Sequence, residues 1–404
     1  MNGHVDDATV SRPTTLDAMI RARAALTPDA PALVGSATAS FAELVDRIDR
    51  VRAVLDDLVG PAVPIAFVGE NHPAWVEAYY GVPGSGRLLV LLNHRLHGRE
   101  LADMIRRSSS GLIVGAPAHL ERLRAADCDV PMLDWETWSV LVDGAAPAPM
   151  GPSIDASTPA WLLFTSGTTA APKGALLSHA SLLAAVDAST AARRVDEDDV
   201  YVFPFPLCHV AGYNLLHRHA NDRPVALLDG FDAGAFCDLV DAVSGTSCSL
   251  AATMLASLVE LAEREPHRVE QLRTLRSIAY GASPMPTDLL RRADALFGVD
   301  FAQGFGMTEL SGNAVFLDGA AHRRGLDGDE SILRSTGVPA PGVEVRIVDD
   351  VDREVAAGVV GEIVVRAPQV MVGYLDDPAA TAATLVDGWL HTGDLGRIDD
   401  GLLY

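Results

Sequence analysis

Hydrophobic positions recur with two different periods along the first part of the chain. Residues 41–58 carry apolar residues three and four positions apart, which predicts an amphipathic helix. Residues 63–70 are apolar almost throughout and predict a buried strand, whereas residues 72–82 return to a helical pattern. Strands that alternate with helices in this way are typical of parallel sheets covered by helices.

The same order of elements returns farther along the chain. Residues 276–283 and 299–306 have strand patterns, and the helix predicted between them, 286–298, has Thr287 as a candidate N-cap and Gly298 just past its end. The carboxyl ends of neighbouring parallel strands lie at one edge of a sheet, where open α/β folds bind ligands. These two ends carry the sequences YGAS and GFGMTE, so we expect a ligand site there.

After about Ser335 the pattern changes. Residues 343–350 and 361–368 alternate apolar and polar positions with no helix between them, which predicts antiparallel sheet or a small barrel. The one long helical pattern in this part covers residues 376–386. The chain is therefore expected to be an α/β protein that ends in a mainly β segment.

Two segments bear on where the units of the chain begin and end. Residues 143–159 are rich in Pro, Ala and Gly and are the best candidate for a linker. At the other end, DDG is a hairpin turn signal that only LLY follows. Two interpretations stay open for this end: a short terminal strand, or a chain that stops at a domain boundary.

Composition and charge narrow the classes of function. A chain of 404 residues, of which 49% are hydrophobic, is long enough for two or three domain-sized units. The net charge of −23 disfavours binding to nucleic acid or an anionic membrane, because a polyanion needs a basic face. The four cysteines show no C-x-x-C spacing and the N-terminus has no signal-peptide pattern, which favours a cytoplasmic location. No apolar stretch approaches the ~18 residues of a transmembrane segment.

One short stretch concentrates groups that bind anions. Residues 164–179, FTSGTTAAPKGALLSH, place hydroxyls, glycine amides and Lys173 between two apolar runs. Hydroxyls and backbone N–H groups in a turn form a concavity for an anion, and a lysine adds a point charge suited to phosphate. The stretch is not a Walker A loop, because Lys173 follows Pro172 and leads into apolar residues instead of Ser or Thr.

Residues 165–174, TSGTTAAPKG, resemble the phosphate-binding signature of the adenylate-forming superfamily, which includes acyl-CoA synthetases. Ala170 departs from the family, which usually has glycine there. Three more segments follow in the family's order: YGAS at 280–283, GFGMTE at 304–309, and WLHTGDLGRID at 389–399. The resemblance extends from about Thr14 to the end of the chain.

The resemblance implies a fold and a division into domains. Residues 1–404 are expected to form the large N-terminal domain of these enzymes, with two helix-flanked, mostly parallel sheets and a small antiparallel, barrel-like subdomain. The approximate subdivision is 1–150 and 160–330 for the two α/β sheets and 335–404 for the mainly β part. The family's small C-terminal domain, with its hinge and its lysine, is expected to be absent from this chain.

The resemblance also assigns a nucleotide site. Hydroxyls, amides and the ammonium of Lys173 would hold the ATP phosphates, and Glu309 would bind Mg²⁺ as a hard oxygen ligand. Phe305 would stack on adenine, and Asp394 would accept hydrogen bonds from the ribose. Lys173, Thr308 and Glu309 are the candidate catalytic residues. The full set of predicted ATP-binding residues is Thr165, Ser166, Gly167, Thr168, Thr169, Lys173, Gly281, Ala282, Ser283, Gln303, Gly304, Phe305, Gly306, Met307, Thr308 and Asp394.

The acid would lie beside this nucleotide. The resemblance places His209 at the border of the acyl site, together with Gly281 and Gly306. The surrounding segment lacks the F-D-x-S pattern of amino-acid-activating domains, so a simple carboxylic acid is expected. Apolar neighbours favour a fatty or other hydrophobic acid, and they are Val210, Ala211, Tyr213 and Leu215.

The implied reaction is ATP-dependent formation of an acyl-adenylate, followed by transfer to the thiol of coenzyme A. The substrates are small molecules, and the sequence does not give the oligomeric state. An acyl-AMP ligase that loads a carrier protein is the alternative within the family. The compact run of residues 309–335 favours coenzyme A over that alternative. A non-catalytic sensor of ATP or acyl-adenylate is the alternative from another class.

Overall fold

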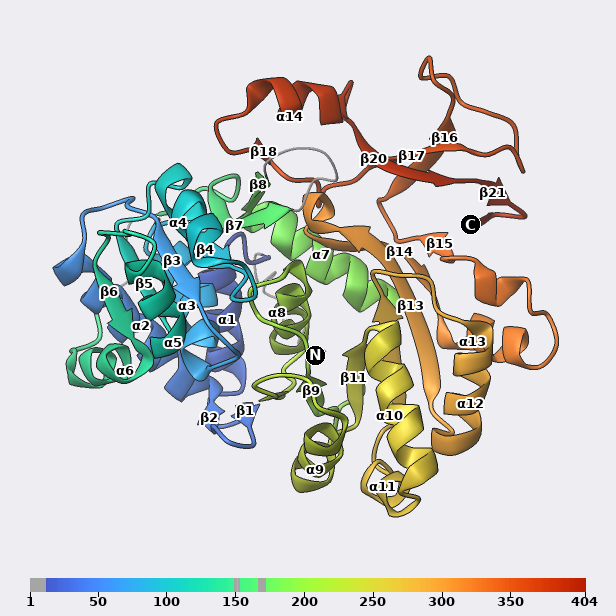
Figure 1. Ribbon diagram of the computed structural model, residues 1–404, viewed down its shortest axis with the longest axis horizontal. Helices are drawn as coiled ribbons and strands as arrows, with labels where there is room; N and C mark the ends of the chain where they lie inside the picture. The colour runs from blue at the N-terminus through green and yellow to red at the C-terminus, as the bar shows by residue number, and fades with distance from the viewer. Residues whose placement is uncertain (1–11, 149–150, 152, 166–171) are drawn as a thin grey trace, which may run out of the picture.

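The computed structural model describes residues 12–148, 151, 153–165 and 172–404. Two helix-covered sheets lie side by side, and a smaller, curved antiparallel sheet lies above their junction (Figure 1). No helix in the described ranges is long and apolar enough to cross a membrane. The predicted fold class, with two mostly parallel sheets and an antiparallel part, is confirmed.

The first sheet has seven strands, of which the central ones are parallel. Their order is β18 (Gly373–Tyr374), β8 (Lys173–Ser178), β7 (Pro159–Thr165), β4 (Leu89–Leu92), β3 (Ile65–Val68), β5 (Leu112–Gly115) and β6 (Met132–Asp134). β8 runs antiparallel to β7, and β18 runs antiparallel to β8. The two segments that flank the predicted phosphate loop are therefore adjacent strands, β7 and β8.

Side chains of this sheet alternate between two cores. In β3, Phe67 packs against Trp75 and Trp138 on one face, whereas Val68 belongs to the cluster of Leu101 on the other. The first face is covered by α1 (Leu16–Leu26), α2 (Phe41–Leu58), α3 (Pro73–Gly84) and α6 (Trp135–Gly144). The second is covered by α4 (Gly98–Arg107) and α5 (Pro117–Arg124).

The second sheet has nine strands and contains the predicted ligand-binding edge. Their order is β15 (Val338–Pro339), β14 (Gly312–Leu317), β13 (Asp300–Met307), β12 (Ser277–Gly281), β11 (Ser247–Leu250), β9 (Tyr201–Phe203), β10 (Val225–Leu227), β1 (Pro31–Val34) and β2 (Ala39–Ser40). The strands from β13 to β1 are parallel, whereas β14, β15 and β2 are antiparallel to their neighbours. The order of strands in the sequence thus does not decide which sheet they join, since β1 and β2 come from the first 40 residues but belong to the second sheet.

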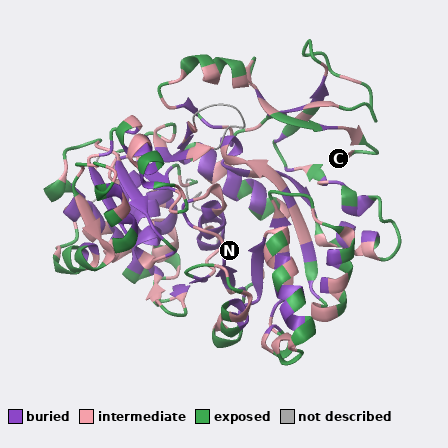
Figure 2. Ribbon diagram, viewed as in Figure 1, coloured by how far each residue is buried: buried purple, intermediate pink, exposed green. Residues whose placement is uncertain are grey.

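The two faces of this sheet differ in character. On the outer face, Leu250, Ile278 and Phe301 pack with the helices α9 (Ala233–Val243), α10 (Ala252–Arg264) and α12 (Thr287–Phe297). The short helix α11 (His267–Gln271) contacts α9 and α10. α10 and α12 show buried and exposed residues in alternation (Figure 2). α7 (His179–Ala192) and α8 (Tyr213–Ala220) lie between the two sheets (Figure 1). α13 (Gly319–Leu326) packs against β13.

Local sequence signals explain most element ends. α2 begins and ends as predicted, with a capping box between Ser40 and Glu43. Gly298 ends α12 with φ 62°, as expected for a left-handed C-cap. The prediction of Thr287 as N-cap is wrong: the cap is Pro286, and Thr287 is already the first helical residue, so its hydroxyl makes no capping bond.

The remaining elements lie near the end of the chain. The curved sheet consists of β16 (Glu344–Val348), β17 (Gly361–Arg366), β20 (Trp389–Gly396) and β19 (Leu385–Val386), all antiparallel. The helix predicted over 376–386 is shorter, because α14 (Pro378–Thr384) gives way to β19. The predicted terminal hairpin forms between β21 (Ile398–Asp399) and β22 (Leu402–Leu403). Single 3-10 turns are η1 (Val210–Gly212), η2 (Thr308–Leu310) and η3 (Ile332–Arg334).

Candidate active site

The two predicted ligand segments meet at one edge of the nine-stranded sheet. β12 and β13 are parallel neighbours, and Gly281 lies opposite Gly304 in their register. β13 ends at Met307 and continues directly into η2, whose first two residues are Thr308 and Glu309. The expected juxtaposition of the two strand ends is confirmed. Nucleotide binding by their residues stays a prediction.

Gly304 and Gly306 are required by the close approach of β14. A Cβ atom at Gly304 would lie 2.1 Å from Nδ2 of Asn313, and one at Gly306 would lie 2.0 Å from the carbonyl oxygen of Gly312. A side chain at Gly304 would displace the side chain of Asn313, and one at Gly306 would displace the backbone of the neighbouring strand. The glycines on either side of Phe305 therefore have a packing reason in addition to the access for adenine that we expected from the sequence.

Glu309 is a buried carboxylate with one clear hydrogen-bond donor. It is only 5% exposed, and its Oε1 accepts a hydrogen bond of 2.8 Å from the Tyr374 hydroxyl. Burial, and then the charge of Glu309, raise the pKa of Tyr374, so the phenol stays protonated and donates. A second contact fixes the turn, because the carbonyl oxygen of Glu309 accepts from the Met371 amide at 2.8 Å.

Lys173 approaches the same tyrosine from the neighbouring strand of the seven-stranded sheet. Its Nζ lies 4.9 Å from the centroid of the Tyr374 ring, within the range of a cation–π contact. The contact follows from sheet pairing, because Lys173 begins β8 and Tyr374 lies opposite Ala175 in β18. Tyr374 therefore connects two of the predicted catalytic residues, Lys173 and Glu309.

Part of the predicted phosphate loop can be placed and part lies outside the described residues. Thr165 ends β7, lies opposite Lys173 in the register of β7 and β8, and donates from Oγ1 to the Lys173 carbonyl at 3.4 Å. The carbonyl of Pro172 accepts a hydrogen bond of 2.7 Å from Arg107 at the end of α4. The predicted residues Ser166, Gly167, Thr168 and Thr169, and the departure at Ala170, lie in the undescribed range 166–171.

A cavity of about 440 Å³ opens at the carboxyl edge of the nine-stranded sheet, and it is not lined by Lys173, Glu309 or Tyr374. Its walls come from η1 and α8 on one side and from β11 to β14 on the other. The predicted site residues that line it are His209, Gly281, Ala282, Gln303, Gly304, Gly306 and Met307. The adenine-flanking and acyl-flanking predictions thus converge on one cavity.

His209 lies at this cavity, directly before η1. Burial, together with the nearby charges of Arg95 and His94, lowers the pKa of its imidazole. The ring is therefore neutral at pH 7, and one of its nitrogens is free to donate to an acid oxygen. His209 thus shares one cavity with Gly281 and Gly306, and its place beside an acyl group stays a prediction.

Some predicted residues lie away from the cavity. Phe305 does not line the cavity and is half buried against the main core, and its stacking on adenine stays a prediction. Asp394 is exposed on β20, in the curved sheet. Leu215, one of the apolar neighbours of His209 that favoured a hydrophobic acid, is fully buried in the core, whereas Tyr213 lines the cavity. Because Leu215 follows Asn214 on α8, about 100° farther round the helix, it faces away from the cavity.

Several residues of the site had no sequence signal. Tyr374 lies on a two-residue strand that the sequence did not predict as an element. Arg193 and Ser249 line the cavity beside Asn214. Arg193 belongs to the charged run ARRVDEDD, a pattern typical of exposed loops, so only the fold reveals its position.

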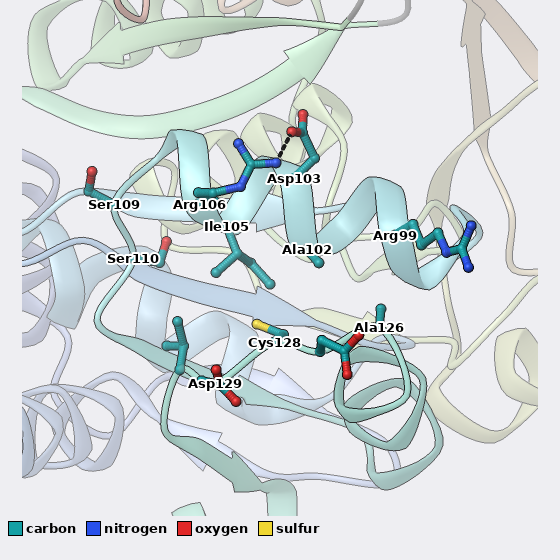
Figure 3. Close-up of a pocket in the computed structure, with 12 residues that line it drawn as sticks. Arg99, Ala102, Asp103, Ile105, Arg106, Ser109, Ser110, Ala126, Cys128 and Asp129 are labelled. Atoms are coloured by element: carbon teal, nitrogen blue, oxygen red, sulfur yellow. Dashed lines mark hydrogen bonds and ion pairs between the residues drawn. The ribbon is translucent and has the colours of Figure 1, made fainter.

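Two other cavities lack the predicted site residues. One, of about 540 Å³, lies between α4 and the segment after α5, where Arg106 pairs with Asp103 and Cys128 lies at the base (Figure 3). The other, of about 860 Å³, lies at the amino ends of β12 and β13 and is bordered by Arg276 and Asp300. The cavity at the carboxyl edge is therefore the candidate active site.

Comparison with known proteins assigns the family. The model of the AMP-binding enzyme family matches residues 20–375. A feruloyl-CoA synthase of an Amycolatopsis species is 32% identical over 95% of this chain and 76% of its own length. A fatty acid–[acyl-carrier-protein] ligase of Streptomyces coeruleorubidus is 31% identical over 93% of this chain and 74% of its own length.

Solved structures agree with this assignment. The o-succinylbenzoate coenzyme A synthetase of Bacillus subtilis, solved with AMP, superposes with a TM-score of 0.84 at 28% identity, and the match covers 96% of this chain and 77% of that one. The chain belongs to the AMP-binding enzyme family and is an adenylate-forming acid–thiol ligase. The resemblance drawn from the four motifs is confirmed.

Proposed function

We propose that this enzyme converts a carboxylic acid with a hydrophobic body to its acyl-adenylate and then passes the acyl group to coenzyme A. A carboxylate oxygen attacks the α-phosphorus of ATP, the bond to the bridging oxygen breaks, and pyrophosphate leaves. The observation that carries the proposal is that Tyr374 joins Lys173 to Glu309, and that Glu309 follows two residues after Met307, which ends β13 and lines the 440 Å³ cavity.

The described residues have complementary roles in this step. Lys173 supplies a positive charge for the phosphates, and the Thr308 hydroxyl supplies a donor for the α-phosphate. Neutral His209 donates a hydrogen bond to the acid. Because the imidazole carries no charge, it does not form an ion pair that would stabilise the carboxylate and reduce its nucleophilicity. Val210, Ala211 and Tyr213 form an apolar wall for the body of the acid. The chain thus contributes mainly orientation and charge neutralisation.

The residues present fit Mg²⁺ bound together with ATP. In the described part of the chain no group of three or more His, Cys, Asp or Glu side chains forms a metal cage. Mg²⁺ does not need one, because it usually takes one or two carboxylates and completes its shell with phosphates and water. Glu309, held by Tyr374, is the carboxylate that would bind it. The bound ion would neutralise phosphate charge.

The identity of the thiol acceptor is a separate part of the proposal. Residues 309–335 hold η2, β14, α13 and η3 with short connections, and this compactness supports coenzyme A. The similarity to an acyl-carrier-protein ligase keeps the carrier protein as the second candidate. Two further points also stay proposals. One is that residues 1–404 form the large domain of a two-domain enzyme, and the other is that the enzyme is cytoplasmic.

The test is acid-dependent release of pyrophosphate from MgATP by the chain, measured with a panel of aliphatic and aromatic acids. Coenzyme A and a phosphopantetheinylated carrier protein are then compared as acceptors of the best acid. We expect pyrophosphate release with hydrophobic acids and thioester formation with coenzyme A. Binding of an acyl-adenylate mimic without pyrophosphate release from any acid would instead support the non-catalytic sensor.

A further inference from the structure

The cavity at the carboxyl edge has an apolar middle and a polar inner end. Ser249, Ala279 and Ala302 lie in register across β11, β12 and β13, and all three line the cavity. This row precedes the row of Gly281 and Gly304 by two residues, so it lies ~7 Å deeper in the sheet. The row of Ser249, Ala279 and Ala302 is therefore the deeper part of the sheet wall, and His209, directly before η1, lines the same cavity.

Arg193 brings a guanidinium to this inner end. It is the C-cap residue of α7 and lies between two cavities, because it lines both the candidate active site and the neighbouring 860 Å³ cavity. Its Nη1 donates 2.6 Å to Oδ1 of Asn214, and its Nη2 lies 3.4 Å from Oγ of Ser249. A guanidinium has five N–H donors, so these two contacts orient the group and leave donors for a ligand.

The neighbouring carboxylates are engaged by other arginines. Buried Arg218 forms an ion pair of 2.8 Å with Asp199, which also accepts from Thr246. Asp196 lies within ion-pair distance of Arg194 and Arg276. Within the residues that the structure describes, no carboxylate lies within 4 Å of Arg193.

The region beneath the inner end thus carries two guanidinium groups and one buried carboxylate. The excess of positive charge affects its neighbours: burial, and then the Arg193 charge, lower the pKa of Arg218 to about 10. Burial, followed by both arginines, lowers the pKa of His217 well below its usual value. A partly buried cation without an anionic partner is costly, and a ligand anion would relieve that cost.

We propose that Arg193 binds a second carboxylate at the far end of the acid substrate, so that the enzyme selects dicarboxylic acids and activates the end beside His209. This inference rests on the proposed function. Met254, Phe316 and Val210 would contact the methylene or aromatic body between the two carboxylates. Asn214 is a positioning residue, because its side chain holds the guanidinium and also donates 3.0 Å to the Ala211 carbonyl.

The test compares pairs of acyl-sulfamoyl-adenosines that have the same chain length and end in either a methyl or a carboxylate group. Their affinities for the chain are measured by titration calorimetry over a series of lengths. At the matching length we expect the carboxylate-ended mimic to bind tighter by roughly tenfold to a hundredfold, as for one charge-assisted interaction. Arg193→Met should abolish this ratio, and Arg193→Lys should retain part of it.

Arg194→Met is the matched control, because Arg194 borders the neighbouring 860 Å³ cavity and not the candidate active site. It should leave the ratio unchanged. The ratio within one variant is insensitive to a general loss of folded protein. Equal binding of both mimics by the unaltered chain, or an Arg193→Met variant that keeps the preference, would overturn the inference and leave the proposed function standing. Failure of every mimic to bind would overturn both.

Discussion

The hydroxyl of Tyr374 donates a 2.8 Å hydrogen bond to Oε1 of Glu309, across 65 residues of sequence. The same tyrosine carries the ammonium of Lys173 over its ring at 4.9 Å. One side chain from β18 therefore orients a carboxylate from the nine-stranded sheet and a cation from the seven-stranded sheet. The relative position of Glu309 and Lys173 therefore depends on the packing of the two sheets against each other.

Tyr374→Phe should remove the donor and keep the ring. The buried Glu309 carboxylate would then lack its hydrogen bond, and we expect the free energy of unfolding in urea to fall by about 1–3 kcal/mol. Combination with Glu309→Ala should give less than the sum of the two losses, because each change removes the same hydrogen bond. Tyr404→Phe is the matched control, since its ring lies under Arg397 at the terminal hairpin. Additive losses would show that the two side chains act independently.

Glu309→Gln should separate metal-dependent from metal-independent binding. An amide is a weaker ligand for Mg²⁺ than a carboxylate, so we expect the rate of MgATP-dependent adenylation to fall ~100-fold. The affinity for an acyl-sulfamoyl-adenosine, which needs no metal, should change little. Glu354→Gln on the surface should change neither quantity. Equal losses for both ligands would mean that Glu309 is structural.

Acid should destabilise the fold through its buried histidines. Burial lowers the pKa of His219 from 6.5 to about 4, and its Nε2–H donates to the Ala32 carbonyl while Nδ1 accepts from the Tyr80 hydroxyl. Below pH 6.5 the unfolded chain binds a proton that the folded chain refuses until about pH 4, so stability is present above 6.5 and falls with pH across this window.

This histidine alone should account for about 3 kcal/mol of the loss. Urea unfolding at a series of pH values measures it. His219→Gln should flatten the slope between pH 6.5 and 4, although it lowers stability at pH 8. His267→Gln, at an exposed site, should leave the slope unchanged. An unchanged slope in His219→Gln would show that other groups carry the acid sensitivity.

Ala282, at the edge of the cavity, has a left-handed backbone with φ 65°. This conformation disfavours a residue with a Cβ atom, so Ala282→Gly should raise the free energy of unfolding by ~1 kcal/mol. The same change at Ala302, inside β13, should lower it, since glycine weakens a strand. Thermal unfolding of both variants measures the contrast. A loss of stability in Ala282→Gly would contradict the claim that the backbone at Ala282 is strained.

Helices and strands were predicted well where the local sequence signals were strong. The helix over 41–58 has a regular amphipathic period and a capping box, and both of its ends were correct. The parallel pair β12 and β13 followed from the strand–helix–strand pattern. The motifs predicted Gly281, Gly304 and Gly306 at one cavity.

The residues that the sequence did not reveal reach the site through long-range packing. Tyr374 faces Glu309 only because β18 pairs with β8, and a two-residue strand has no periodic pattern. Arg193 occupies the cavity because α7 ends beside α8, although its charged surroundings in sequence resemble a surface loop. Of the apolar neighbours of His209, Leu215 lies in the core and Tyr213 lines the cavity, because composition does not reveal which face of a helix meets a cavity.

Thermal unfolding of the chain with acyl-sulfamoyl-adenosines of graded acyl structure tests the central claim most directly, because these mimics occupy an acyl-adenylate site without any chemistry. At a hundredfold its dissociation constant, a mimic should stabilise the fold by ~2.7 kcal/mol, and adenosine alone should give much less. Stabilisation by at least one mimic, lost when His209 is replaced by a bulky residue, is the predicted result. No stabilisation by any mimic would contradict the assignment of this cavity as an acyl-adenylate site.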